Sequence, residues 1–254
     1  MNSYKKGLVS IITPMHNSDK FIAATIDSVI AQTYRQWEMI VVDDFSTDNS
    51  RSIVESYVLK DQRIKLIICE KKSENGPIDV RNRAILEAKG QYIAFLDSDD
   101  CWDDNKLEIQ LMFISEVDVA FIYSDYRVYD EKKHKMVSVF KAPTKISYRD
   151  LCKVNNIGCL TVVYDVSKLG KVFVVDAPKR EDFATWLYIL KKVDFAYNVG
   201  KCLATYCIHD NSFSSKKAEL IKYQWRVYRK NEGFGILKSF YYLIQTIVHK
   251  IFKY

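Results

Sequence analysis

The first hundred residues of this chain alternate short, continuous apolar runs with segments whose apolar residues recur at helical spacing. The runs predict strands at residues 8–13, 38–42, 64–69 and 92–96, and the segments between them predict helices at residues 20–32, 46–60 and 77–90. A strand that is apolar at every position has both faces buried, and strands that alternate with helices usually pair in parallel. The pattern therefore predicts an α/β fold: a mostly parallel sheet covered by helices on both faces.

Two helix ends carry recognisable signals. Ser46 and Asp48 are candidates for the N-cap of the second predicted helix, because both side chains accept hydrogen bonds from exposed backbone N–H groups. Gly90 stands where the third predicted helix should end. We therefore expect the helices to begin and end near these residues.

Polar segments follow three of the predicted strands, at residues 13–17, 43–50 and 97–100. In parallel sheets ligands bind at the carboxyl ends of the strands, so these segments are expected to share one binding edge. The same segments contain neither a GxGxxG turn nor a GxxxxGK[ST] loop. Their absence argues against a dinucleotide-dependent dehydrogenase and against a phosphate-loop NTPase.

Five aspartates fall within eight positions in the stretch "DSDDCWDD". Asp103 and Asp104 stand where the next helix should begin, so we assign them to the helix start. Asp97 and Asp99 end a buried strand, where close like charges are costly unless a cation pairs with them. The two carboxylates fit Mg²⁺ or Mn²⁺ that also holds a diphosphate. Asp100 is left open between support of that site and a plain loop charge.

From about residue 105 the pattern becomes mixed. It predicts helices at residues 105–116 and 180–192, a hairpin at 126–140, and strands at 119–125 and 161–164. No linker rich in proline, glycine or serine separates the halves, so we expect a single folding unit.

The composition excludes several classes of protein. Hydrophobic residues make up 48% and charged residues 28%, typical of a globular chain, and no apolar run is long enough to span a bilayer. The six cysteines are scattered without a CxxC pair, which favours a reducing cytoplasm over a disulfide framework or a zinc site. No nucleic-acid-binding signature is present. The net charge of +6 suits a protein that works near anionic lipids or phosphorylated ligands, and solubility alone is the alternative explanation.

The stretches "VSIITPMHNSDKFIAATIDSVIAQTYRQWEMIVVDDFSTDNS" and "VRNRAILEAKGQYIAFLDSDD" resemble the nucleotide-sugar-binding half of family 2 glycosyltransferases, which are inverting enzymes with the GT-A fold. The resemblance covers residues 8 to about 107, and its short motifs recur in the family's order. It implies a Rossmann-like nucleotide-sugar-binding half at residues 1–104, an acceptor-binding half with a mixed sheet at residues 105–217, and a C-terminal helical tail at residues 218–254.

The resemblance also implies a set of contacts to the donor nucleotide. These residues are Thr13, Pro14, His16, Asn17, Asp43, Asp44, Arg81 and Ser98. His16 stands where the family most often has tyrosine. Asp43 has a structural alternative as a hydrogen-bond acceptor for the turn that follows it, and Arg81 has one as a surface charge.

A second signature, "REDFATWLYILKK", resembles the family segment that supplies the general base. An inverting transfer is a direct displacement, so the acceptor hydroxyl must lose a proton as it attacks. The resemblance assigns this task to Asp182 and acceptor positioning to Glu181; the alternative is a pair of carboxylates that only begins a helix. We expect Trp186 and Leu190 to belong to the core.

A third signature, "YCIHDNSFSS", resembles a family segment whose histidine completes the metal site or touches the diphosphate; the alternative is a histidine that only makes a structural hydrogen bond. It adds His209 to Asp97 and Asp99 as ligands of Mn²⁺ or Mg²⁺, and Ser212 and Ser214 match the segment too. Cys207 stands where the family usually has arginine, so the positive charge near the leaving phosphate is either missing or supplied by a lysine. The two candidate lysines are Lys216 and Lys217.

The tail carries apolar residues at helical spacing with lysines beside them. The apolar positions are Phe240, Leu243, Ile244, Ile247, Val248 and Ile251, and the lysines are Lys238, Lys250 and Lys253. Such a helix fits a membrane interface, and equally a helix packed on its own domain or on a second subunit of a homo-oligomer.

Together these features imply a metal-dependent inverting glycosyltransferase of surface polysaccharide synthesis. It would move a sugar from a nucleoside diphosphate sugar, by preference a UDP-sugar, to a saccharide acceptor linked to a lipid such as undecaprenyl diphosphate. We expect it in the cytoplasm or peripherally on the inner face of the cell membrane. A nucleotidyltransferase is disfavoured because "TPMHNSDK" has no glycine. A non-catalytic sugar-nucleotide-binding or scaffolding subunit remains the alternative.

Overall fold

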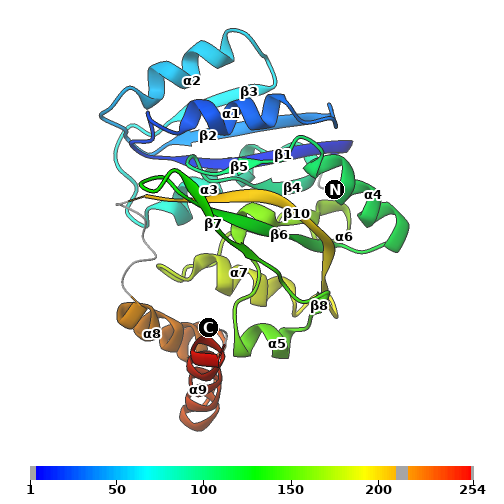
Figure 1. The fold of residues 1–254 in the computed structure, drawn as a ribbon, viewed down its shortest axis with the longest axis vertical. Helices are drawn as coiled ribbons and strands as arrows, with labels where there is room; N and C mark the ends of the chain where they lie inside the picture. Colours follow the sequence, from blue (N-terminus) through cyan, green and yellow to red (C-terminus); the bar gives the residue numbers. More distant parts are fainter. Residues whose placement is uncertain (1–3, 210–216, 253–254) are drawn as a thin grey trace.

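The computed structural model describes residues 4–209 and 217–252, which build one ten-stranded sheet with helices on both faces (Figure 1). The strand order is β3-β2-β1-β4-β9-β6-β10-β5, with β7 paired to β6 and β8 paired to β10. The strands are β1 (Lys5–Met15), β2 (Trp37–Asp43), β3 (Ile64–Ile68), β4 (Gly90–Phe95), β5 (Cys101–Trp102), β6 (Phe121–Asp130), β7 (Lys135–Phe140), β8 (Lys145–Ile146), β9 (Val163–Asp165) and β10 (Ala196–Ile208).

Strands β1 to β4 pair in parallel, whereas the rest of the sheet is mixed. The helices are α1 (Ile22–Ile30), α2 (Ser50–Val58), α3 (Pro77–Glu87), α4 (Lys106–Val117), α5 (Tyr148–Lys153), α6 (Val166–Leu169), α7 (Glu181–Ile189), α8 (Lys217–Arg226) and α9 (Ile236–Phe252). A 3₁₀ turn (Cys159–Thr161) precedes β9, and a π-helical segment (Val227–Asn231) follows α8. This arrangement confirms the predicted α/β fold.

Neighbouring residues of β1 belong to different hydrophobic cores, which explains why the strand is apolar throughout. Ile11 packs with Ile26 of α1 and Leu107 of α4 on one face of the sheet. Ile12 packs with Ala84 of α3 on the other face. All five side chains are fully buried. Helices on both faces therefore require the continuous apolar runs by which the strands were recognised.

The helix signals at Gly90 and Ser46 were misassigned, whereas the one at Asp48 is confirmed. Helix α3 ends at Glu87, and Gly90 is the first residue of β4. A Cβ atom at Gly90 would lie 2.5 Å from the carbonyl oxygen of Leu8, so the glycine allows close approach to β1. Helix α2 begins at Ser50, and the Asn49 side chain makes no capping hydrogen bond. Asp48 Oδ1 accepts from the backbone N–H of Ser50 at 3.0 Å, so Asp48 supplies the capping contact.

In the second half, the predicted strand at residues 119–125 and the first arm of the hairpin form one strand, β6, because β10 pairs with it as far as Asp130. Asp103 does not cap α4: its carboxylate forms an ion pair with Arg127 at 2.7 Å, and α4 begins at Lys106. Asp103 thus lies at the start of α4 as predicted, where its carbonyl oxygen accepts from the backbone N–H of Lys106 at 3.0 Å, but its side chain has no capping role.

Helices α8 and α9 lie beside α5, at the end of the molecule far from β3 (Figure 1). One face of α9 is buried here, through Ser239, Tyr242 and Thr246. Among the described residues, none of the helices is both long enough and apolar enough to cross a bilayer.

Candidate active site

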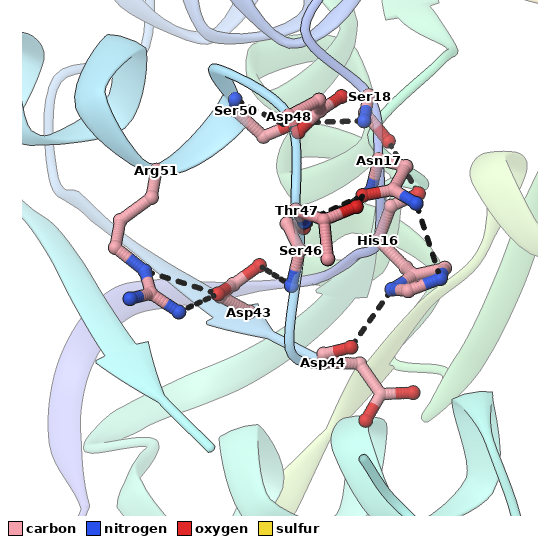
Figure 2. Close-up of polar contacts among 10 residues, drawn as sticks. All are labelled: His16, Asn17, Ser18, Asp43, Asp44, Ser46, Thr47, Asp48, Ser50 and Arg51. Carbon is pink, nitrogen blue, oxygen red and sulfur yellow. Dashed lines mark hydrogen bonds and ion pairs between the residues drawn. The ribbon is translucent and has the colours of Figure 1, made fainter. Parts of the chain in front are cut away.

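Three turns at the carboxyl ends of β1, β2 and β4 meet at Ser18. Its backbone N–H donates to Ser50 Oγ at 2.7 Å (Figure 2), and its hydroxyl lies 2.7 Å from the hydroxyl of Ser98. Ser18 and Ser98 are both buried. The three polar segments therefore lie together, as predicted. Ser98 joins the turn after β4 to the other two through its contact with Ser18.

His16 and Asn17 connect the first turn to the second (Figure 2). Asn17 has a positive φ of 51°, and its side-chain oxygen accepts from the backbone N–H of Thr47 at 2.8 Å. His16 Nδ1 lies 2.8 Å from the carbonyl oxygen of Asp44, and because a carbonyl only accepts, Nδ1 must carry the hydrogen. Both side chains are exposed, so they line the edge of the site.

Thr13 and Pro14 lie at the end of β1, beneath this turn. Thr13 is fully buried, and its hydroxyl has no hydrogen-bond partner among the described residues. Pro14 is half-buried. A buried hydroxyl without a partner is costly, and a bound ligand or a water molecule can satisfy it.

The two aspartates after β2 have different partners. Asp43 is fully buried and accepts from the backbone N–H of Ser46 and from Arg51, at 3.2 and 2.9 Å (Figure 2). These bonds fit the structural alternative for Asp43. Asp44 points away from them, and its oxygens accept from the backbone N–H and the hydroxyl of Ser73, both at 2.7 Å.

Arg81 joins the two halves of the chain. Its guanidinium lies 2.6 Å from Asp97 Oδ1 and 3.3 Å from Glu181 Oε1. Only 8% of the Arg81 side chain is exposed, so the alternative of a plain surface charge is wrong. Burial alone would lower the pKa of Arg81, but the charge of Asp97 and the charge of Glu181 outweigh it and raise the pKa.

The carboxylates after β4 are crowded and largely withdrawn from water. Burial and the negative charge of Asp97 raise the pKa of Asp99, although His209 Nε2 lies 2.7 Å from its carboxylate. Burial raises the pKa of Asp100 further above the ordinary value, with the charges of Asp99 and Asp97 adding to it. Asp100 also accepts from the backbone N–H of Cys207, so it fixes the end of β10 beside this turn.

These residues fit a hard divalent cation in the chemistry of their donor atoms. Asp99 and Asp97 provide carboxylate oxygens that lie close enough for the charge of Asp97 to raise the pKa of Asp99, and His209 provides a ring nitrogen. The His209 ring stacks on Phe21 with centroids 4.9 Å apart, which holds it toward Asp99. Within the described part of the chain, no three metal-binding side chains already stand in one cluster.

Glu181 and Asp182 open helix α7. Burial raises the pKa of Glu181, and the neighbouring Arg81 counteracts part of that effect. Asp182 Oδ1 accepts from the backbone N–H of Phe183 at 2.6 Å, and its Oδ2 accepts from Asn155 at 3.3 Å. Trp186 and Leu190 are buried, as expected for core residues.

A cavity of ≈ 230 Å³ lies beside Glu181. Residues 74–78 line one side of it, and Pro178 and Lys179 line the other. It therefore opens where the loop before α3 faces the loop before α7.

Three polar residues of the site were not identified from the sequence: Ser18, Ser73 and Asn155. Serine and asparagine are common in turns, and their partners lie between 27 and 80 positions away along the chain. The predictions for Ser212, Ser214, Lys216 and the Lys217 side chain fall outside the described part of the chain.

Comparison with known proteins agrees with this geometry. The model of the family "Glycosyl transferase family 2" matches residues 10–165. A solved structure of S. aureus TarS residues 1–349 in complex with UDP-GlcNAc superposes with a TM-score of 0.70 at 21% identity, covering 92% of this chain and 70% of that one. This likeness confirms the GT-A fold.

Two bacterial relatives match almost the whole chain. The putative teichuronic acid biosynthesis glycosyltransferase TuaG of Bacillus subtilis (strain 168) is 40% identical over 248 residues, 98% of each chain. The UDP-Glc:alpha-D-GlcNAc-diphosphoundecaprenol beta-1,3-glucosyltransferase WfgD of Escherichia coli is 40% identical over 251 residues, 97% of this chain and 95% of that protein. This chain is a glycosyltransferase and belongs to glycosyl transferase family 2.

Proposed function

We propose that this enzyme transfers a sugar, with inversion, from a UDP-sugar to a saccharide carried on a polyprenyl diphosphate. The observation that supports this most is Arg81, which brings Asp97 of the nucleotide-sugar-binding half within one side chain of Glu181 of the acceptor-binding half. Asp97 and Glu181 are 84 positions apart in the sequence, yet both carboxylates contact the buried guanidinium of Arg81. The site thus combines groups for the donor with groups for the acceptor.

The donor nucleotide lies, in this proposal, against the three turns that meet at Ser18. His16, Asn17 and Asp44 line this edge, and the buried hydroxyl of Thr13 lies beneath it. UDP is favoured because the E. coli relative is named for UDP-Glc and the TarS structure holds UDP-GlcNAc.

In the transfer, Asp182 takes the proton of the acceptor hydroxyl as that oxygen attacks the anomeric carbon, and the nucleoside diphosphate departs from the opposite side. Glu181 positions the acceptor beside the neighbouring cavity. Asp99 and Asp97, with His209, would hold Mg²⁺ or Mn²⁺. When bound, this cation offsets the charge that develops on the leaving diphosphate.

Transfer assays with UDP-, GDP- and dTDP-sugars in the presence of Mn²⁺ test the activity. We expect turnover with a UDP-sugar and a synthetic lipid-linked saccharide acceptor. Asp182→Asn should abolish transfer while donor affinity is retained, and Asp99→Ala should weaken metal-dependent UDP binding in calorimetry. Failure of every donor would leave the non-catalytic, scaffolding alternative as the better explanation.

We further propose that α9 rests on the inner surface of the cell membrane. Its solvent-facing side is an apolar stripe consisting of Ile236, Leu237, Phe240, Tyr241, Ile244, Ile247 and Val248. Leu237 alone is 88% exposed, and Lys238 lies exposed beside it. The chain carries a net charge of +6, which suits an anionic lipid surface, and the E. coli relative is named for a diphosphoundecaprenol acceptor.

Flotation with phosphatidylglycerol vesicles tests this placement. The protein should float with the vesicles, and the double variant Leu237→Glu, Phe240→Glu should not. The alternative result is that the protein does not bind the vesicles but forms a dimer, and that the same double variant abolishes the dimer. The stripe would then be the contact with a second copy of the chain.

A further inference from the structure

The carboxylate of Asp182 is held from both sides. Its Oδ1 accepts from the backbone N–H of Phe183, in its own helix, at 2.6 Å. Its Oδ2 accepts from Asn155 Nδ2 at 3.3 Å, across 27 positions of sequence. Asn155 lies in the segment between α5 and the 3₁₀ turn, so it is the contact that ties the carboxylate to a different part of the fold.

The amide of Asn155 has a defined orientation. Its oxygen accepts from the backbone N–H of Ile157 at 3.2 Å, so the NH₂ group must be the end that faces Asp182. An NH₂ group that donates to a carboxylate fixes the rotation of that carboxylate. A general base requires this, because its oxygen must be aimed at the acceptor hydroxyl.

The segment that carries Asn155 is in turn held by the C-terminal helices. Tyr228 donates its hydroxyl to the carbonyl oxygen of Cys152 at 2.6 Å, and Thr246 of α9 donates to the carbonyl oxygen of Lys153 at 2.8 Å. These carbonyl groups end α5, two and three positions before Asn155. The end of α5 is therefore fixed by residues from the tail.

Tyr228 also contacts the other partner of the base. Its ring packs edge-on against Phe183, with centroids 6.1 Å apart, and both rings are fully buried. Phe183 is the residue whose backbone N–H binds Asp182 Oδ1. Tyr228 therefore contacts Phe183, whose backbone N–H binds Asp182, and also the end of α5, which leads to Asn155.

We propose that Asn155 is a positioning residue for the general base, and that Tyr228 fixes Asn155 and Phe183 relative to each other. This inference rests on the proposed role of Asp182. It gives the C-terminal helices a part in catalysis in addition to the proposed membrane contact.

Substitution of Asn155 tests the first half of the proposal. Asn155→Ala should lower kcat by about 10- to 100-fold while KM for the donor sugar is unchanged, because a base misplaced by a fraction of an ångström is less effective. Asn155→Asp keeps the shape but replaces the NH₂ group by an oxygen, so its kcat should be lower than that of Asn155→Ala. A residue that only filled space would give the reverse order.

Asn198→Ala is the matched control, since Asn198 makes a comparable bond to Asp125 at 2.7 Å elsewhere in the fold. It should lower the melting temperature but leave kcat unchanged. Wild-type kcat in Asn155→Ala, or higher activity in Asn155→Asp than in Asn155→Ala, would overturn the positioning role. If Asp182→Asn itself retains activity, the assignment of the base has failed instead.

Tyr228→Phe tests the second half, because it removes the hydroxyl and keeps the ring. We expect kcat to fall with KM for the donor unchanged. Tyr57→Phe is the control, since that hydroxyl binds Asp27 at 2.8 Å between α2 and α1. Equal kcat values for the two variants would show that the tail does not act on the base.

Discussion

Removal of the Arg81 guanidinium should destabilise the folded protein, because Arg81 neutralises two carboxylates at once. In Arg81→Met the apolar part of the side chain is kept and the charge is lost. The side chains of Arg81, Asp97 and Glu181 are 8%, 31% and 17% exposed, so water can compensate only part of the loss.

Loss of one partner of a buried ion pair costs about 3–5 kcal/mol. Asp97 is partly solvated, so we expect the lower end of this range, about 3 kcal/mol in the free energy of unfolding. In a chain of this size each kcal/mol lowers the melting temperature by about 2–4 °C. Arg81→Met should therefore melt about 6–12 °C below the wild type.

Thermal unfolding followed by circular dichroism, without nucleotide, measures this difference. The double variant Arg81→Met, Glu181→Gln should recover part of the loss, because the glutamine leaves no buried charge without a partner. A shift of less than about 2 °C in Arg81→Met, or effects of the two substitutions that simply add, would refute the account of Arg81 as the link between the two halves.

Three further outcomes follow from other parts of the structure. Ser18→Ala removes the hydroxyl shared with Ser98 and should cost about 1 kcal/mol in urea unfolding, together with weaker UDP binding in calorimetry. Asp44→Ala should weaken UDP binding. The melting temperature should fall only by the amount expected from the loss of the two hydrogen bonds between Asp44 and Ser73. Burial lowers the pKa of Lys106 well below its ordinary value, so the folded state binds this proton less readily than the unfolded state. Lys106→Met should therefore stabilise the protein at neutral pH, and unfolding measured from pH 7 upward should show this gain shrinking toward about pH 10.4.

The sequence was informative where structure depends on local pattern. The runs at residues 8–13 and 38–42 identified β1 and β2 because strands buried on both faces must be apolar at each position. The convergence of the polar turns followed from parallel pairing alone. The assignment of Asp97 and Asp182 to the site rests on the resemblance to the family motifs rather than on any local structural signal, and it stays a prediction.

Long-range side-chain partners could not be predicted in this way. Arg81 meets Glu181 across 100 positions, and nothing local distinguishes a buried bridging arginine from an exposed one. Asp48 binds the start of α2 as predicted, but nothing local shows that its second oxygen accepts from the backbone N–H of Asp19 in the neighbouring turn. Asp103 was assigned to a helix start, but its carboxylate forms an ion pair with Arg127 of β6. In each case the tertiary partner lies far away along the sequence, so no local pattern identifies it.

The two proposals for the C-terminal helices have a common structural basis in the two faces of α9. The buried face holds the end of α5 through Thr246, next to the segment of Asn155, while the opposite face carries the apolar stripe. An enzyme whose acceptor is anchored in a bilayer must present its base at a defined height above that surface. A helix that contacts the lipid on one side and supports the segment of the base on the other would fix this height directly. Disruption of the stripe should therefore reduce transfer to a lipid-linked acceptor much more than transfer to a water-soluble one, whereas Tyr228→Phe should reduce both.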